Sequence, residues 1–443
     1  MLAVETRPQQ LLGPLVGALA VGAATDLLLF GRPPGLGMTI TMLVILVGFW
    51  RVASHRRSLL VVAALFSLVP TLRSSLALAT IAVLVYGICV VVIVGWSPPF
   101  TRWTLAEFGW STVATLTSLG QTPEALRNTE GGAWRRTVPW IRGVALSIIP
   151  LLIFAFLLGS ADAVFGDLIF NHEWINPERW VRFLLCSLIV AWVVFGWWQQ
   201  VRQPDRIRSN QVRPRFRART EALVLLAALN ALFAGFVVVQ FAYLFGGRTL
   251  RIEIGYAEYA RRGFFELVVV ASLVLGTVLL VDWVTQYRTE GRSKLIDFLH
   301  SALIVQTFGV VASALTRMRA YTVQFGLTEL RLYTTAFMIW VAIVLGGCAL
   351  TVVRARRDRF AYVAFISGLV ICAGLVVANP DGLIARINVE RYQAGTALDI
   401  NYLGNLSADA LGALNHPDTE DARLTIASRL VDQDWRSWSL PEG

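Results

Sequence analysis

Two charge-dense segments carry the side chains in this sequence that could bind a ligand. Each combines arginine with tyrosine and glutamate. Arginine presents a planar fork of donors that matches a carboxylate or a phosphate. The segments therefore predict a binding site for an anionic group, an ion-pair network that fixes helix ends, or a surface for a protein partner. The candidate residues are Tyr256, Glu258, Tyr259, Arg261, Arg262 and Glu266 in the first segment, and Arg317, Tyr321, Glu329, Arg331 and Tyr333 in the second.

Helical spacing would align these side chains. Glu258, Arg262 and Glu266 are four residues apart, so on a helix they form one ionic stripe. In the second segment, Gly326 predicts a break between two helical pieces. Charges at the edge of a bilayer are costly unless they are paired or face a polar cavity. Both segments are therefore expected at the ends of membrane helices.

Three polar side chains lie inside apolar stretches. They are Asn230, Gln240 and Gln306. Such residues most often form hydrogen bonds between membrane helices. A substrate path lined by them is the alternative interpretation.

Catalytic and metal-binding patterns do not occur in the sequence. The four histidines are scattered, and the four cysteines lie singly in apolar runs without CxxC spacing. Zinc-protease, Walker and GxSxG motifs do not occur either. We predict no catalytic residue, no metal site and no cofactor, and nothing in the sequence calls for an enzyme.

The elements that must position these residues are apolar helices. The chain has 443 residues, of which 56% are hydrophobic and 15% charged, too apolar for an ordinary soluble protein. Many segments reach the roughly 20 apolar residues that one helical span needs. The sequence predicts an all-α, polytopic transmembrane bundle of about 11 spans. The expected spans are residues 10–30, 36–52, 57–70, 74–96, 141–160, 180–198, 220–246, 264–285, 295–316, 332–353 and 360–378.

Charge distribution orients these spans. Seven arginines crowd the loop at 199–219, which should stay in the cytoplasm. Alternation then places the N-terminus inside and both charge-dense segments outside. Residues 57–70 form the shortest expected span, which either crosses the membrane or dips into it. We therefore expect a multi-pass protein of the bacterial cytoplasmic membrane.

Three further segments complete the expected organisation. Residues 1–378 form the transmembrane domain, and within it residues 97–140 form a tryptophan-rich connection on the cytoplasmic interface. Residues 379–443 form a short helical tail, rich in acidic side chains, on the extracytoplasmic face. Because the basic charge lies in short loops, we expect contacts with membrane lipids and none with nucleic acid.

Several motifs carry a family resemblance. Gln240–Gly247, Tyr256–Leu267, Gly326–Tyr333 and Asn379-Pro380-Asp381 resemble a bacterial polytopic membrane protein family of unknown function, domain of unknown function number four-one-seven-three. Tail segments at Asp399–Leu403, Leu406–Ala410 and Asp434–Trp438 are similar to its ending. The resemblance covers approximately residues 140–443. It implies a multi-helix membrane protein and supplies no catalytic residue.

Three functions remain open. The leading hypothesis is a non-enzymatic envelope module for binding or signalling, with an anionic envelope component or a membrane protein as its partner. A transporter or flippase of an anionic or lipid-linked substrate is the alternative. A membrane-embedded, lipid-modifying enzyme comes last, since no acid–base or metal constellation supports it.

Overall fold

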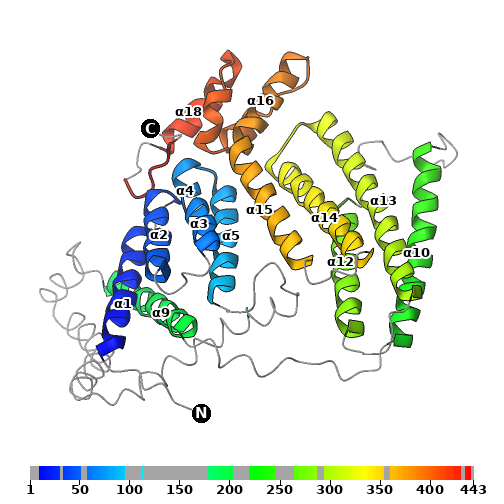
Figure 1. Cartoon of the computed structure of the whole chain (residues 1–443). Coiled ribbons are helices and arrows are strands. Elements are labelled where there is room, and N and C mark those ends of the chain that lie inside the picture. The colour runs from blue at the N-terminus through cyan, green and yellow to red at the C-terminus, as the bar shows by residue number, and fades with distance from the viewer. Residues whose placement is uncertain are drawn as a thin grey trace, which may run out of the picture.

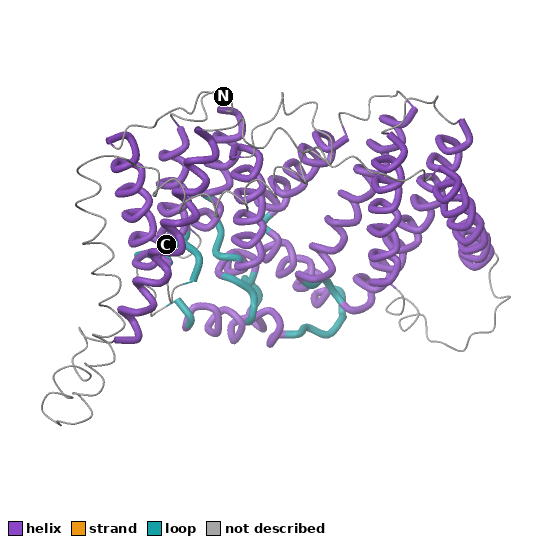
Figure 2. The backbone as a smooth tube through the Cα atoms, turned by 90° about the horizontal axis from the view of Figure 1, so that it is seen from below, coloured by secondary structure: helices purple, strands orange, loops and turns teal. Residues whose placement is uncertain are grey.

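A computed structural model describes residues 9–29, 33–50, 57–94, 112, 177–202, 219–245, 264–286, 294–353, 360–430 and 435–440. All regular structure in these ranges is helical, as predicted, and Figure 2 shows helices joined by loops. The α-helices are α1 (Gln9–Leu29), α2 (Leu36–Trp50), α3 (Arg57–Ser67), α4 (Val69–Leu72), α5 (Leu76–Val94), α9 (Pro177–Arg202), α10 (Arg219–Phe245), α12 (Phe264–Gln286), α13 (Lys294–Phe325), α14 (Glu329–Val353), α15 (Phe360–Ala378), α16 (Pro380–Gln393), α17 (Ile400–Gly404) and α18 (Glu420–Ser428). The 3-10 helices are η5 (Ala408–Ala413) and η6 (Pro417–Thr419).

The long helices pack as two groups joined by α15 (Figure 1). One apolar core lies among α2, α3, α4 and α5, and includes Leu60, Leu78 and Ile93. The other lies among α10, α12, α13 and α14, around Leu303 and Leu345. Side chains of α15 pack against the first core, while the helix also runs along α14. The bundle is thus continuous across α15.

The expectation of about 11 spans is wrong for the described part of the chain. Four helical segments there are long and apolar enough to cross a membrane: Leu76–Val94, Lys294–Phe325, Glu329–Leu350 and Phe360–Ala378. The other apolar helical segments there have 10–17 residues. The expected span at 141–160 lies outside the described residues.

Residues 57–72 show how a local break shortens an apolar run. The helix is interrupted at Leu68, so α3 has 11 residues and α4 has four, with Pro70 at the start of α4. The proline ring removes a backbone donor and favours a helix start at this point. The whole stretch is among the shorter apolar helices.

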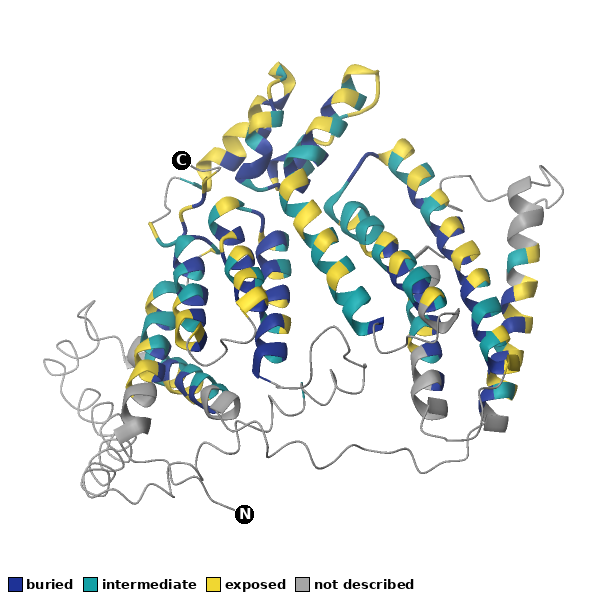
Figure 3. Ribbon diagram, in the orientation of Figure 1, coloured by how far each residue is buried: buried dark blue, intermediate teal, exposed yellow. Residues whose placement is uncertain are grey.

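Exposed residues run along several of the long helices (Figure 3), and many of them are apolar. In α15, Phe360 is the one buried residue, whereas Val370 and Val377 are 65% and 81% exposed. Soluble proteins bury such surfaces, while lipid tails accept them. The exposed apolar faces therefore suit a membrane protein.

The C-terminal helices α16 to α18, with η5 and η6, form a cap on one end of the bundle (Figure 1). This cap has its own core, in which Ile384, Leu403 and Leu414 are almost fully buried. Leu327, from the connector between α13 and α14, joins that core. The cap therefore packs on the bundle through apolar as well as polar contacts.

The last described residues return to the beginning of the chain. The amides of Leu36 and Gly37 donate to the carbonyls of Trp438 and Arg436 at 3.1 and 2.7 Å. A Cβ atom on Gly35 would overlap the backbone of Ser437. Glycine at this position therefore allows the C-terminal segment to cover the turn between α1 and α2.

Candidate functional site

Five candidate residues of the first charge-dense segment lie outside the described residues: Tyr256, Glu258, Tyr259, Arg261 and Arg262. The same holds for the side chains of Glu266 on α12 and Gln240 on α10. In the described part of the chain, the candidate site lies at the second segment and the elements around it.

The second segment forms the turn between α13 and α14. Gly326 adopts a φ of 83°, a left-handed conformation that favours glycine. This confirms the predicted break between two helical pieces. Arg331 donates to the carbonyl of Gly326, and its guanidinium lies 4.2 Å from the centre of the Tyr321 ring. These contacts make Arg331 a brace for the turn.

Arg317, Glu329 and Tyr333 lie apart from that brace. Arg317 is further back on α13 and is half-buried. The backbone amide of Glu329 donates to the hydroxyl of Tyr402, in α17 of the cap, at 2.8 Å. The Tyr333 hydroxyl is buried beside Ser75, which precedes α5. The structure thus brings Glu329 and Tyr333 to the junction between the bundle and the cap.

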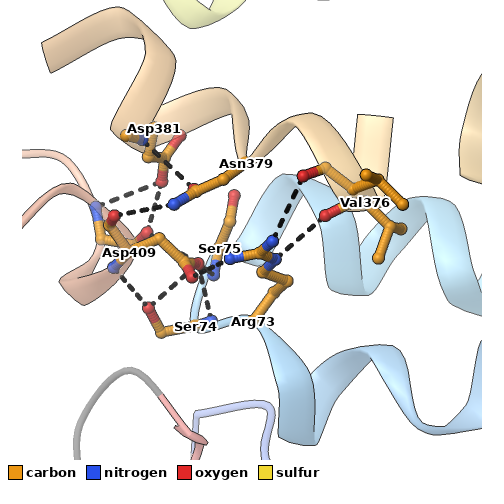
Figure 4. Close-up of polar contacts among 10 residues, drawn as sticks. Arg73, Ser74, Ser75, Val376, Asn379, Asp381 and Asp409 are labelled. Carbon is orange, nitrogen blue, oxygen red and sulfur yellow. Dashed lines mark hydrogen bonds and ion pairs between the residues drawn. The ribbon is translucent and has the colours of Figure 1, made fainter. Parts of the chain in front are cut away.

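Asp409 of the cap is the centre of this junction (Figure 4). Its Oδ2 accepts hydrogen bonds from the amides of Ser74 and Ser75 at 2.8 and 3.1 Å, and its Oδ1 lies 3.5 Å from the Arg73 guanidinium. Its own amide donates to Ser74 Oγ at 3.1 Å. Since α5 begins at Leu76, Asp409 satisfies donors at the start of a helix that is distant in the chain.

Arg73 connects the same junction to α15. Its Nε donates to the carbonyl of Val376 at 3.0 Å, and one terminal nitrogen lies 3.5 Å from the carbonyl of Val377. These carbonyls belong to the last turn of α15, where the helix dipole favours a cation. The guanidinium of Arg73 therefore both neutralises Asp409 and caps the C-terminal end of α15.

Asp381 is the second buried carboxylate of the junction. It is 1% exposed, and its Oδ2 accepts from the amide of Ser407 at 3.3 Å and also from the Ser407 hydroxyl. Asn379 precedes it and caps α16, accepting from Gly382 at 3.2 Å and donating to the Asp409 carbonyl at 3.0 Å. Figure 4 shows Asp381 and Asp409 near each other, with Asn379 beside them.

Three helix N-termini converge here, those of α5, α14 and α16. A helix N-terminus carries a partial positive charge and would attract an anion. Glu329, Asp381 and Asp409 place the chain's own carboxylates at these ends. We call these three residues the carboxylate cluster.

Burial raises the pKa of two side chains outside the spanning helices. Desolvation raises the pKa of Asp409 above its ordinary value, with Asp381 adding to the rise and Arg73 opposing it. Burial, together with Glu329 and Asp381 nearby, raises the pKa of Tyr402 to about 12. The Tyr402 hydroxyl therefore stays neutral at physiological pH.

Two of the three predicted intramembrane polar residues lie together. Asn230 on α10 donates to the carbonyl of Leu299 on α13 at 3.0 Å, and Gln306 on α13 donates to Asn230 Oδ1 at 3.3 Å. These bonds join two apolar helices. They place both side chains in an interhelical contact.

Sequence reasoning missed most of this junction. The sequence places Asp381 and Asp409 only within motifs of the family resemblance, and it assigns Ser74 and Ser75 to the start of the expected span 74–96. The available signal was the position of these polar residues directly before or after apolar helices. Within the described residues, no group of three or more His, Cys, Asp or Glu side chains could hold a metal ion.

Comparisons with known proteins give one match. A family model described as Domain of unknown function (DUF4153) matches residues 60–416. The family number expected from the motifs, four-one-seven-three, is therefore wrong, and the match begins well before residue 140. No curated protein and no solved structure matches the chain.

Proposed function

Because the chain belongs to the DUF4153 family, whose function is unknown, we propose a function from its own geometry. The protein is a multi-pass protein of the bacterial cytoplasmic membrane. It acts as a non-enzymatic binding module, in which the cap and the neighbouring connectors form a platform on the extracytoplasmic side. Its ligand is an anionic envelope component.

The arrangement of the helix ends supports this topology. The connectors at 73–75, 326–328 and 379 meet at the cap and therefore lie at one end of the bundle. Arg57 and Lys294 begin α3 and α13 at the opposite end (Figure 1). Basic residues at that end suit the cytoplasmic side.

The observation that carries the proposal is the docking of the cap through Asp409. A tail that served only as a tether would not need a buried carboxylate bonded to two amides and a guanidinium. These bonds fix a folded surface beside the outer connectors. Rigid platforms of this kind are typical supports for binding loops.

Topology is tested by thiol labelling in intact cells. Glu420, exposed on α18, and Ser209, in the arginine-rich loop, are each replaced by cysteine. We expect a membrane-impermeant maleimide to label Glu420→Cys from outside and Ser209→Cys only after permeabilisation. The wild-type chain, with its four native cysteines, is the control. Reversed labelling would overturn the topology.

Ligand binding is tested with phosphatidylglycerol as the probe, by native mass spectrometry of the purified protein. We expect the double variant Arg261→Gln, Arg262→Gln to lose about tenfold in affinity, which corresponds to about 1.4 kcal/mol. Arg386→Gln, on an exposed part of the cap, is the matched control and should bind as the wild type does. Equal binding by the double variant would refute the anion site.

A vesicle flux assay separates the module from a transporter. The interhelical bond between Asn230 and Gln306 engages two side chains that a substrate path would use. We therefore expect no flux of phosphate or labelled phosphatidylglycerol above protein-free vesicles. Protein-dependent flux that saturates with substrate would replace the binding module with a transporter.

A further inference from the structure

Residues 435–440, which we call the C-terminal strap, have an order of burial that water does not favour. Ser437 and Ser439 are almost fully buried, whereas three large apolar side chains are between 41% and 59% exposed: Trp435, Trp438 and Leu440. A segment that docks on a water-soluble protein usually does the opposite, because burial of large apolar side chains provides most of the stabilisation. The outer side chains of the strap therefore require an apolar environment beyond the chain.

Close backbone contacts explain which side chains of the strap are buried. The amide of Gly37 donates to the carbonyl of Arg436 at 2.7 Å. A Cβ atom on Gly35 would overlap the backbone of Ser437. At such a close approach only a small side chain fits between the strap and the turn that joins α1 to α2. Serine occupies these inner positions, and the bulky side chains remain outside.

Arg436 fixes the strap at the end of α1. One terminal nitrogen of its guanidinium donates to the carbonyl of Leu27 at 2.7 Å, in the last turn of that helix. A cation is favoured at this position, because the helix dipole places negative charge there. The strap thus lies where α1 ends and α2 begins.

This end of α2 lies at the level where a candidate span begins. The hydroxyl of Thr71, in α4, donates to the hydroxyl of Thr39, in the first turn of α2, at 2.7 Å. α5 follows directly after α4 and has 19 residues. A helix of that length rises about 28 Å, close to the roughly 30 Å of bilayer hydrocarbon. The start of α5 therefore lies near the boundary between acyl chains and headgroups.

Exposed apolar side chains occur on the neighbouring elements at the same end. Leu72 of α4 and Leu76 of α5 are both exposed. The apolar side chains of the strap thus lie at the end of the bundle where the lipid-facing surface of α5 begins. A continuous lipid boundary would cover both.

We propose that the C-terminal strap is an interfacial anchor, whose Trp435, Trp438 and Leu440 side chains insert between the headgroups and the acyl chains of the adjoining leaflet. Indole suits this zone, because its ring is apolar and its N–H group finds acceptors among headgroups and water. Leucine adds apolar area on the acyl side. The lipid surface then holds the strap over the turn between α1 and α2.

The anchor rests on the membrane location given under the proposed function. It depends neither on the anionic ligand nor on the side of the membrane that the cap occupies. It assigns a lipid contact to the end of the chain, in addition to the binding platform that the cap provides.

Fluorescence quenching on the full chain tests the anchor. Leu440→Cys, Val370→Cys and Gln393→Cys are each labelled with bimane in nanodiscs of phosphatidylethanolamine and phosphatidylglycerol. Val370, exposed on apolar α15, reports the lipid environment, and Gln393, exposed at the end of α16, reports water. The labelled wild-type chain gives the background from the four native cysteines. We expect headgroup-nitroxide lipids to quench Leu440→Cys several times more strongly than Gln393→Cys, and iodide to show the reverse order.

The controls separate failure of the anchor from failure of the membrane location. If iodide quenched Leu440→Cys as it does Gln393→Cys while lipid quenched Val370→Cys, the anchor would be overturned and the membrane location retained. Shielding of Leu440→Cys from both quenchers would also overturn the anchor. Covalent dimers of Leu440→Cys on oxidation would then identify a second copy as the cover. Val370→Cys without lipid quenching would refute the membrane location and the anchor with it.

Hydrogen exchange measures whether lipid holds the strap in place. Exchange is followed in the peptide that contains the Gly37 amide, which donates to the strap. In the same nanodiscs, we expect the double variant Trp435→Gln, Trp438→Gln to exchange about tenfold faster, because the strap opens more often. Leu424→Gln, an exposed leucine on α18 outside the strap, is the matched control and should exchange as the wild type does. Equal rates in the double variant would show that the strap does not depend on its outer side chains, and would overturn the anchor.

Discussion

Asp409 caps the N-terminus of a helix that begins more than three hundred residues before it: its Oδ2 accepts the amide of Ser75 at 3.1 Å across a separation of 334 positions. The bond replaces the local side-chain cap that helices usually find within one turn. It makes the start of α5 dependent on the cap. Folding of the N-terminal helices and docking of the C-terminal segment are thus coupled.

Asp409→Ala tests that coupling. The change leaves the amides of Ser74 and Ser75 without their acceptor and Arg73 without its partner, so we expect a loss of about 2–4 kcal/mol. Asp409→Asn retains one acceptor oxygen and should lose less. The free energy of unfolding in detergent is the measurement. Asp421→Ala, on the exposed face of α18, is the control. If Asp409→Ala behaved like it, the cap would not depend on this bond.

Tyr402→Phe should have a cost that does not change with pH. The substitution removes the acceptor of the Glu329 amide, for an expected loss of about 1–3 kcal/mol. Because the pKa of Tyr402 is raised to about 12, the stability that its neutral hydroxyl provides is complete below pH 10 and is lost only as pH approaches 12. Denaturant titrations at pH 5, 7 and 9 should therefore give the same difference. A cost that disappeared by pH 9 would contradict this assignment.

Gly326→Ala should destabilise the turn between α13 and α14. The φ of 83° is unfavourable for alanine, and the new methyl group would overlap Asn388 and Arg391 of α16. We expect a loss of about 1–3 kcal/mol and a weaker contact between the turn and the cap. Gly374→Ala, in α15, meets no atom within 4 Å and serves as the control. Thermal unfolding of both variants in one detergent compares them. Similar melting temperatures would show that the turn tolerates a side chain.

The bond between Asn230 and Gln306 is tested by a double-mutant cycle. Asn230→Leu and Gln306→Leu each remove one partner of a hydrogen bond between α10 and α13. We expect a coupling of about 0.6–2 kcal/mol, the range measured for polar contacts between membrane helices. Strict additivity in the cycle would mean that the bond contributes nothing to the packing of these helices.

Local sequence properties were sufficient to predict individual helices and helix breaks. The apolar run at 76–94 and the glycine at 326 correctly predicted a long helix and a helix break, because both follow from composition and backbone sterics over a few residues. The predicted number of spans is wrong where a helix break interrupts an apolar run. At Leu68, for example, an apolar run is divided although its composition remains favourable.

Only part of the candidate site could be predicted from the sequence. The spacing of the second segment indicates Glu329 and Tyr333, but Asp381 and Asp409, which lie near them, are far along the chain and have no periodic relation to them. Arg331, a candidate for an anion site or an ion-pair network, also braces its own turn. Spacing identifies which side chains share a helix face. It does not identify the face that another element will cover.

For the described residues, the sequence by itself determined a helical structure with segments apolar enough for a membrane, because hydrophobic length and backbone preferences act locally. Tertiary structure alone decided that the starts of α5, α14 and α16 meet, and that their positive ends gather the carboxylates of Asp409, Glu329 and Asp381. That convergence depends on the packing of helices distant in sequence. Burial then removes water from Asp381 and Asp409, whose carboxylates accept hydrogen bonds from backbone amides of residues distant in the chain.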